Sequence, residues 1–182
     1  MVATVKIWRP VRQPGVELLR ADDIRHVFPK HFHDAYCIPV IERGAMISLY
    51  RGRRNELAAG TVDILDPGEV HTSWGAGGNG YSYRCFYIDA VVVQRAANEP
   101  GETRLALLWP RFARRERALF AALRRAHIGL EAADDLEGET RLTEALAALL
   151  ARCRRARPLA AAASPRASRG PPSTSPRTST SR

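Results

Sequence analysis

Residues 16–90 alternate short apolar runs with turn-forming residues. Gly, Pro, Asn and Asp separate the runs at short intervals, as at Gly44 and in the loop 51–55. This spacing is typical of antiparallel strands in a sandwich or barrel. Pro39 lies within one run and cannot donate a backbone hydrogen bond, so we expect it at a sheet edge or a bulge. The predicted strands are 16–20, 25–32, 36–43, 45–50, 56–58, 61–65 and 81–88.

A different pattern follows the last strand. Residues 91–113 have the texture of a linker, and from residue 114 apolar side chains recur at helical spacing. Asp134 or Asp135 can cap a second helix that runs to Cys153. Two amphipathic helices joined by a short loop form an αα-hairpin. Its apolar stripe must pack on the barrel, on a second chain or on both.

The net charge of the chain is concentrated at one end. The chain has 28 Lys and Arg against 19 Asp and Glu, a net charge of +9. Seven of the Arg lie in residues 154–182, which contain no acid, so the remainder carries a net charge of only +2. A basic nucleic-acid groove across the folded domain is therefore not expected. Binding of nucleic acid by the tail remains a further hypothesis, and its affinity should fall steeply with salt.

The tail 154–182 also differs in composition. It consists almost entirely of Ala, Pro, Ser, Thr, Arg and Gly, without apolar periodicity. Such a segment cannot build a core, so we expect it to be disordered. Two origins are open: a native basic tail, or the product of a frameshift in GC-rich DNA.

The cysteines and apolar runs indicate the compartment. Cys37, Cys85 and Cys153 are odd in number and lack CxxC spacing, so a disulfide framework is not expected. No apolar run reaches the roughly 18 residues of a membrane helix, and the N-terminus lacks a signal-peptide core. The sequence predicts a cytoplasmic protein without a membrane partner.

Three motifs in the barrel region carry polar side chains that could do chemistry. The first is His31-Phe32-His33, whose imidazoles share one face of a strand. The second runs from Gly60 through a Pro-Gly turn to His71. The third is the aromatic strand 81–88, in which Tyr81, Tyr83, Cys85 and Tyr87 share one face.

In their order and spacing, these motifs resemble the effector-binding domain of AraC-type transcription regulators. The resemblance rests on HFHDAYCIPVIERG, AAGTVDILDPGEVHT and YSYRCFYIDA, and it spans about residues 12–153. It implies a mainly β fold: a cupin-like antiparallel β-barrel (jelly roll) followed by an α-helical hairpin. The implied partners are a small-molecule effector and a second copy of the chain, and no cofactor is expected. The implied dimerisation residues are Leu119, Leu123, Leu142, Leu146 and Leu149.

The resemblance also suggests the residues of an effector pocket. Arg43 matches an arginine that contacts the sugar in the family's sugar-binding member, although a surface role at a strand end is equally open. Cys85 replaces a bulkier aromatic residue, so the effector need not be a sugar. Tyr83 could be a ligand contact or plain core. The candidate ligand-binding residues are His31, His33, Tyr36, Arg43, His71, Trp74, Tyr83 and Cys85.

The histidines allow other interpretations. Neutral imidazoles bind Zn or Fe, and metal-bearing cupins use an HxH pair, a Glu four or five residues later and a further His. Here Cys37 and Ile38 occupy the positions where that Glu would lie. His31, His33 and His71 could still hold a metal in a small metal-dependent cupin enzyme, which is the alternative function. They could also be structural, with hydrogen bonds across strand ends.

The function expected from the sequence is that of a ligand-sensing and dimerisation domain, not an enzyme. Related regulators continue into two helix-turn-helix motifs, and no helical pattern follows Cys153 here, so we expect no specific operator binding. On effector binding, the N-terminal segment with Trp8 should order over the barrel mouth. The expected organisation is an arm (1–15), a barrel (16–90), a linker (91–113), dimerisation helices (114–153) and a disordered tail (154–182).

Overall fold

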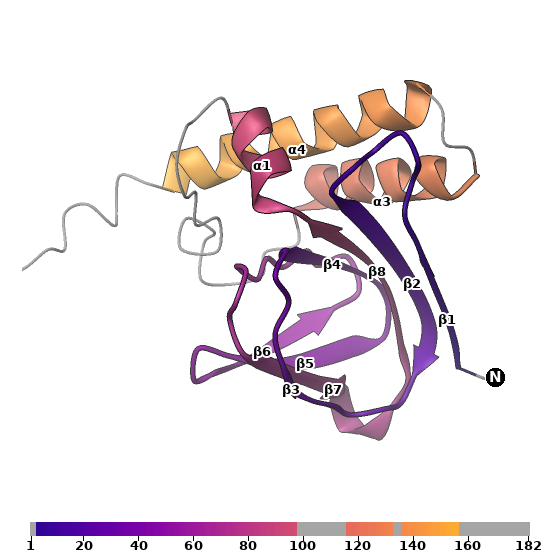
Figure 1. Cartoon of the computed structure of the whole chain (residues 1–182). Helices are drawn as coiled ribbons and strands as arrows, with labels where there is room; N and C mark the ends of the chain where they lie inside the picture. Colours follow the sequence, from indigo (N-terminus) through magenta and orange to yellow (C-terminus); the bar gives the residue numbers. More distant parts are fainter. Residues whose placement is uncertain (1–2, 98–115, 133–135, 157–182) are drawn as a thin grey trace, which may run out of the picture.

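Two four-stranded antiparallel sheets face each other and enclose the core of a barrel (Figure 1). The computed structural model describes residues 3–97, 116–132 and 136–156. The first sheet has the order β1-β2-β8-β4, and the second has the order β3-β7-β5-β6. The strands are β1 (Thr4–Trp8), β2 (Val16–Ile24), β3 (Phe28–His31), β4 (Tyr36–Arg43), β5 (Ala45–Tyr50), β6 (Arg53–Ala58), β7 (His71–Gly75) and β8 (Tyr81–Ile88).

On β4 and β8 of the first sheet, both faces are buried along most of the strand. On β8, Tyr83 and Cys85 belong to the core between the two sheets, whereas Phe86 and Ile88 belong to a second core beneath the helices. This alternation follows from the two-residue period of a strand. The paired sheets and the helices that follow confirm the predicted cupin-like β-barrel with an α-helical hairpin.

The segment 61–65, predicted as a strand, runs along the outer edge of β4 without forming a continuous ladder. Cys37 and Leu65 exchange both backbone hydrogen bonds, at 3.1 and 2.9 Å. At Pro39 the ladder has a single bond, from the Asp63 amide to the Pro39 carbonyl at 3.1 Å. Proline has no N–H to return the second bond, which explains why this pairing consists of isolated bridges. Pro39 thus faces the irregular edge of its sheet, as the sequence predicts.

Asp63 in this segment provides a prediction about pH. Burial raises the pKa of its carboxyl to about 6, although the carboxylate accepts a hydrogen bond from the Ile64 amide at 2.9 Å. A raised pKa means that the folded protein holds this proton more tightly than the unfolded chain, whose Asp titrates near pH 3.9. The ionised side chain therefore destabilises the fold above about pH 6, and this penalty disappears as the pH falls below 4.

Asp63→Asn should accordingly be more stable than the wild type at pH 8, by about 1–3 kcal/mol. At pH 3.5 the two proteins should have nearly the same free energy of unfolding. Urea unfolding at both pH values measures the difference, with the exposed Asp34→Asn as the matched control. If the difference in free energy of unfolding between Asp63→Asn and the wild type does not change with pH, the raised pKa of Asp63 is contradicted.

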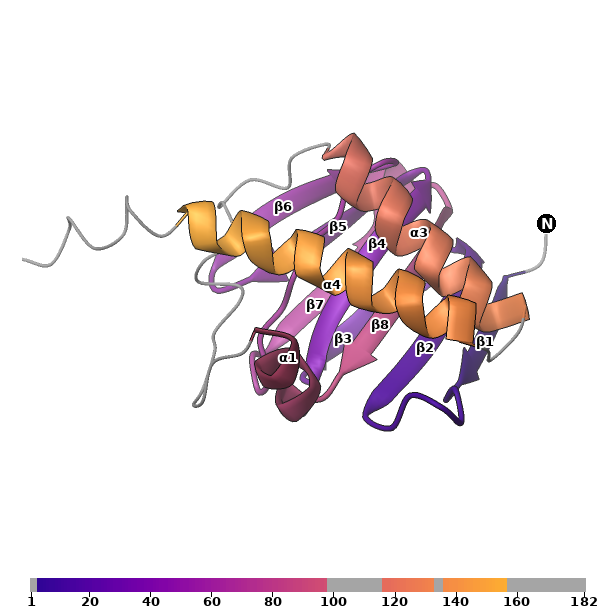
Figure 2. The same cartoon turned by 90° about the horizontal axis from the view of Figure 1, so that it is seen from above.

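In the described part of the chain, three helices follow the barrel. They are α1 (Ala90–Ala97), α3 (Arg117–Ala132) and α4 (Leu136–Ala156). Figure 2 shows α3 and α4 lying side by side across the first sheet. α1 lies mostly within the segment expected as a linker. Its run of β-branched valines does not favour a helix by propensity, but Val93 and Ala97, one turn apart, are buried in the helix-side core.

The leucines expected at a dimer contact lie inside the subunit. Each is at most 5% exposed, and all pack with the outer face of the first sheet. The helical stripe is therefore buried on the barrel within the subunit, and a role of these leucines in dimerisation stays a prediction. The five residues are Leu119, Leu123, Leu142, Leu146 and Leu149.

The N-terminal segment begins with β1, which pairs with β2 along the edge of the first sheet. Trp8 donates from its indole Nε1 to the Leu130 carbonyl at 3.4 Å, and its ring lies edge-on to His127 at 5.1 Å between centroids. Arg12 bonds Glu139 of α4 at 2.8 Å. In this structure Trp8 and Arg12 attach the segment to α3 and α4, on the side of the sheet away from the barrel interior.

Some expectations fall outside the described residues. These are the helix caps at Asp134 and Asp135, most of the expected linker and the tail from residue 157 onward. In the described part of the chain, no helix is long and apolar enough to cross a membrane.

Candidate functional site

A cavity of about 250 Å³ lies between the two sheets. Both sheets contribute to its wall, and so does the segment 61–65 through Leu65. No Arg, Lys, Asp or Glu is among the described residues that line it. The lining residues are Leu19, Phe28, His31, His33, Cys37, Pro39, Met46, Ser48, Leu65, His71, Ser73, Tyr83, Cys85 and Tyr87.

Three histidines form a cluster at this cavity. His31 of β3 is the register partner of His71 on β7, and their ring centroids are 4.3 Å apart. The ring centroid of His33 lies 4.9 Å from that of His31 and 5.2 Å from that of His71. One ligating nitrogen from each ring can be chosen so that all three lie within 4.8 Å of one another. The HxH spacing and the strand pairing thus bring together three residues from two distant motifs.

Backbone carbonyls fix the orientation of two of these rings. His31 donates from Nδ1 to the Pro29 carbonyl at 2.7 Å, and His71 donates from Nδ1 to the Glu69 carbonyl at 3.0 Å. A carbonyl oxygen only accepts, so Nδ1 of each ring carries the hydrogen and Nε2 of the neutral ring keeps its lone pair.

Burial favours the neutral form of two of these histidines. It lowers the pKa of His33 to about 4, and the neighbouring His71 and His31 add to the effect. Burial also lowers the pKa of His71, against a raising effect of its hydrogen bond to Glu69. Near pH 7 the imidazoles of His33 and His71 are therefore hydrogen-bonding or metal-binding groups rather than cations.

The other polar groups of the wall are hydroxyls and thiols. Ser48 and Ser73 are register partners on β5 and β7, and both are buried. Tyr83 is 8% exposed, and burial is the main cause that raises the pKa of its hydroxyl far above the usual value, so it stays protonated. The ring of Tyr87 lies 4.7 Å from that of His33. The wall can therefore surround an apolar body and offer it a few hydrogen bonds.

The structure brings five of the eight candidate ligand-binding residues to the cavity: His31, His33, His71, Tyr83 and Cys85. It places the other three elsewhere. Tyr36 is buried in the helix-side core, because it lies on the opposite face of β4 from Cys37 and Pro39. Trp74 lies on the opposite face of β7 from His71 and Ser73.

Arg43, the third candidate outside the cavity, lies at the surface end of β4. The register with β8 shifts between Ile41 and Arg43, which places Arg43 opposite Ser82. Its guanidinium donates to the Ser82 hydroxyl at 3.0 Å and lies 3.5 Å from Asp22. Arg43 is therefore not among the described residues that line this cavity, and its contact with a ligand stays a prediction.

The sequence interpretation did not include several lining residues. Cys37, Pro39 and Met46 are apolar or nearly so, and nothing in their chemistry distinguishes a cavity wall from solid core. Ser48 had a usable signal, since it is a polar residue between the apolar Ile47 and Leu49 of the predicted strand 45–50, whereas Ser73 lies outside the predicted strands.

On the opposite face of β8, a cluster of charged side chains joins the sheet to α3. The guanidinium of Arg84 contacts Glu42 at 3.1 Å, Glu131 at 2.6 Å and Nδ1 of His127 at 3.1 Å. His127 is fully buried and donates from Nε2 to the Leu19 carbonyl at 3.0 Å. Burial, aided by the charge of Arg84, lowers the pKa of His127 to about 4.

The side chain of Leu19 lines the cavity, while its carbonyl accepts this bond from α3. Cys85 likewise lines the cavity, directly after Arg84 in the chain. The cavity wall and the helix contacts thus belong to adjacent residues of the same strands.

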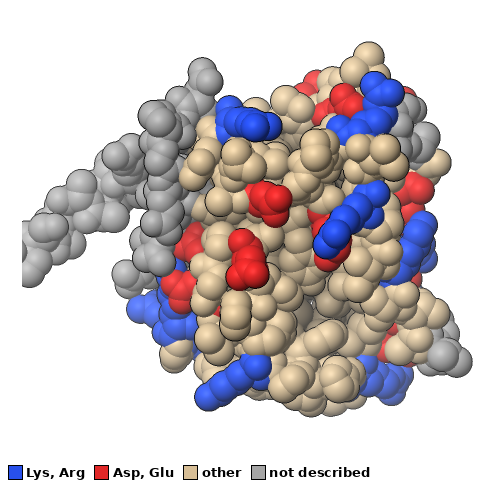
Figure 3. All heavy atoms as spheres, in the orientation of Figure 1, with Lys and Arg blue, Asp and Glu red and all other residues tan. Residues whose placement is uncertain are grey.

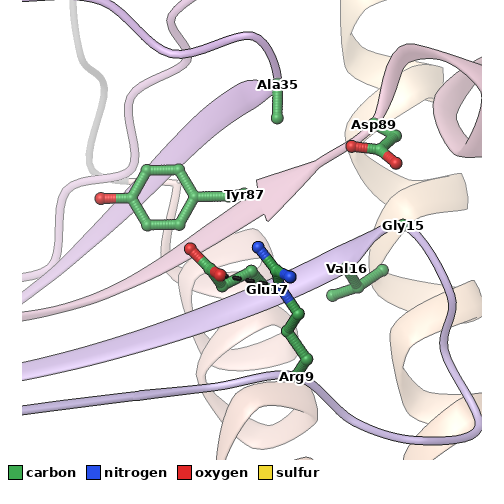
Figure 4. Close-up of a pocket in the computed structure, with 7 residues that line it drawn as sticks. All are labelled: Arg9, Gly15, Val16, Glu17, Ala35, Tyr87 and Asp89. Atoms are coloured by element: carbon green, nitrogen blue, oxygen red, sulfur yellow. Dashed lines mark hydrogen bonds and ion pairs between the residues drawn. The ribbon is translucent and has the colours of Figure 1, made fainter.

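A second pocket, of about 330 Å³, shares Tyr87 with the cavity (Figure 4). The guanidinium of Arg9 lies beside the carboxylate of Glu17 at 2.9 Å, and the Tyr87 ring points away from Asp89. On the face seen in Figure 3, acidic and basic side chains lie among one another without a continuous basic patch.

Comparison with known proteins identifies the family. Residues 13–146 match the family described as the AraC-like ligand binding domain. The chain belongs to this family. The match covers more than half of the chain, including the barrel and most of the helical part of this AraC-like domain.

Individual relatives are distant. The uncharacterized HTH-type transcriptional regulator YbfI of Bacillus subtilis is 27% identical over 84 residues. These make up 46% of this chain and only 30% of the regulator. Among solved structures, the AraC-like domain is similar to a cupin-like protein of Thermotoga maritima, with 18% identity and a TM-score of 0.43 over 50% of this chain and 71% of the other. For KdgF of Halomonas sp. the identity is 17% and the TM-score is 0.40. That alignment covers 47% of this chain and 78% of KdgF.

Proposed function

We propose that this chain is a ligand-sensing domain of a transcription regulator and that it takes up a small uncharged molecule between its two sheets. The cavity is the observation that carries the proposal. It is lined by aromatic rings, imidazoles and hydroxyls and by no ionic side chain among the described residues. Its 250 Å³ corresponds to about eight water molecules. A single-ring compound with one or two hydrogen-bonding groups matches these dimensions.

Family membership and the position of the cavity support the sensing role over catalysis. β2 and β8 form part of the cavity wall on one face and contact α3 on the other. A ligand that shifts Leu19 or Cys85 would act on the attachment of the helices through the same strands. Pairing with a second copy remains part of the proposal. It would use outward-facing side chains of α3 and α4 instead of the five buried leucines.

The choice of an uncharged ligand can be tested with two probes of the same ring size. Benzyl alcohol should raise the melting temperature of the full chain in a concentration-dependent way, because a ligand that binds only the native state stabilises it. Benzoate should not, because its carboxylate would be desolvated without a cationic partner. Differential scanning fluorimetry measures both.

A cavity-filling variant provides the control. Ser73→Leu should remove the response to benzyl alcohol, whereas Trp74→Phe, at the neighbouring residue outside the cavity, should keep it. Equal stabilisation by both probes, or a response that survives Ser73→Leu, would contradict binding of an uncharged ligand in this cavity.

The histidine cluster supports a second candidate function, that of a metal-dependent cupin enzyme. His31 and His71 have their Nδ1 atoms held by carbonyls, as metal-ligating histidines often do. His31, His33 and His71 would hold the ion. Three nitrogens with one open position fit a catalytic Zn²⁺ site, which activates a bound water.

Metal analysis separates this candidate from the sensor. For a metal site, dialysis against Zn²⁺ should leave one equivalent bound to the wild type and to His26→Ala. His33→Ala should lose it, because two imidazoles hold zinc much more weakly than three. Mass spectrometry of the acid-digested protein gives the metal content. Equal metal in the wild type and His33→Ala would exclude the site.

A further inference from the structure

Two thiols are in contact in the wall of the cavity. Cys37 on β4 and Cys85 on β8 are both buried, and their Sγ atoms are 3.3 Å apart. Both residues line the cavity, so a molecule small enough to enter it can reach them. The third cysteine, Cys153, lies on α4 in the helix-side core and serves as an internal comparison.

The pairing of the strands places the two cysteines diagonally. Cys37 is the register partner of Tyr87, and Cys85 is the register partner of Pro39. Cα atoms of diagonal neighbours are about 7–8 Å apart, whereas those of a disulfide are usually about 4.4–6.8 Å apart. A bond between these sulfurs would therefore draw β4 and β8 together locally. A disulfide under such strain is readily reduced again, which is typical of reversible rather than structural bridges.

The reduced pair is stabilised by its hydrogen bonds. The Cys85 thiol donates to the Phe86 carbonyl at 3.6 Å, which leaves Sγ of Cys85 to accept from Cys37. The contact with Cys85, together with burial, raises the pKa of Cys37 well above its usual value. Little thiolate is present at neutral pH, so the pair should resist brief exposure to oxidant and react slowly.

We propose that Cys37 and Cys85 form a redox-active dithiol that closes to a disulfide in the cavity wall when a small uncharged two-electron oxidant enters. The azo compound diamide is a probe of this class. The thiolate of one cysteine adds to its N=N bond, and the thiolate of the other then attacks that sulfur. An S–S bond forms, and the azo group leaves as the hydrazine with the two electrons and two protons of the thiols.

The opposite face of β8 carries the helix contacts. Arg84 and Phe86 flank Cys85 in the chain, and both face α3. A local movement of β8 against β4 would therefore change both the shape of the cavity and the surface on which α3 packs. The dithiol itself does not depend on the proposed sensing role. Only its effect on ligand uptake does.

The test uses the reduced full chain. It is incubated with diamide, unfolded in iodoacetamide and digested with trypsin. The expected product is one cross-linked pair of peptides, residues 31–43 joined to residues 85–95, with Cys153 alkylated. The intact protein should lose the mass of two hydrogen atoms and should recover it with dithiothreitol.

Three variants complete the test. Cys153→Ser should form the same cross-link as the wild type, whereas Cys37→Ser and Cys85→Ser should not form it. Because the peptide map is read on the wild type, a variant that fails to fold leaves the result intact. Three free thiols after prolonged exposure to diamide, or a cross-link that includes Cys153, would overturn the proposal.

The response to benzyl alcohol, measured on the oxidised and the reduced protein, then tests the link to ligand uptake. A smaller response after oxidation supports the link, and an unchanged response removes it. If benzyl alcohol binds neither form, the proposed sensing of an uncharged ligand fails. The peptide cross-link still tests, on its own, whether Cys37 and Cys85 form a disulfide.

Discussion

Replacing Arg84 with Met is expected to lower the free energy of unfolding by about 3 kcal/mol. The guanidinium side chain is 8% exposed and joins Glu42 of β4 to Glu131 and His127 of α3. Its removal leaves two largely buried carboxylates with fewer partners, and a buried charge that loses its partner is strongly destabilising. Glu131 keeps its contact with Arg20 at 3.2 Å, which limits the loss.

Urea unfolding followed by circular dichroism measures this difference. Arg43→Met is the matched control. The Arg43 side chain is 58% exposed, and it forms an ion pair with Asp22 at the surface. Such a pair contributes about 1 kcal/mol or less. If the two substitutions have equally small effects, the charged cluster does not hold α3 on the sheet.

Leu123→Ala should lower the free energy of unfolding by about 2–5 kcal/mol. Leu123 is fully buried in the core that α3 shares with the outer face of the first sheet, so the substitution leaves a cavity inside the subunit. The loss should not change with protein concentration, because Leu123 packs within the subunit. Thermal unfolding over a wide range of concentrations checks this point.

Leu136→Ala on α4 is the matched leucine for this prediction. It is 68% exposed, and the substitution should change stability by less than about 0.5 kcal/mol. A loss for Leu123→Ala that disappears at high protein concentration would place Leu123 at a subunit contact. That outcome would restore the dimerisation role expected from the sequence.

The sequence predicts the barrel well because most of its signals are local. Turn residues separate the runs, and the strand that carries Tyr83 and Cys85 has one polar or aromatic face. For the histidine cluster, only part of the signal is local in the sequence. The HxH spacing gives His31 and His33 a common face, but the pairing that brings His71 beside them depends on the tertiary structure.

The choice of face on β4 could not be made from its sequence. Residues 36–41 are all buried, because the cavity lies on one side of this strand and the helices lie on the other. The strand therefore lacks an alternation of apolar and polar residues. Without that alternation, the sequence does not show that Tyr36 and Cys37 face different cores. Arg43 lies outside the cavity for another reason, a register shift that a single strand does not reveal.

The helices show a similar limit. Their apolar period predicts a buried stripe but not the surface that covers it. The same five leucines satisfy the period whether they face a second chain or the sheet, and the structure packs them on the sheet. The N-terminal segment shares this ambiguity. Trp8 is expected over the barrel mouth when the effector is bound, and in this structure it contacts Leu130 and His127 of α3.

The alternation along β8 has a consequence for how such a domain can diversify. Tyr83 and Cys85 face the cavity, while Arg84 and Phe86 face the helices. Under the proposed sensing role, substitutions at the first pair would alter which molecule is recognised without changing the residues that contact α3. Ligand preference could then evolve on one face of the strand while the helix contacts on the other face stay the same. The same separation gives a protein engineer a short set of positions for a library of altered effector specificity.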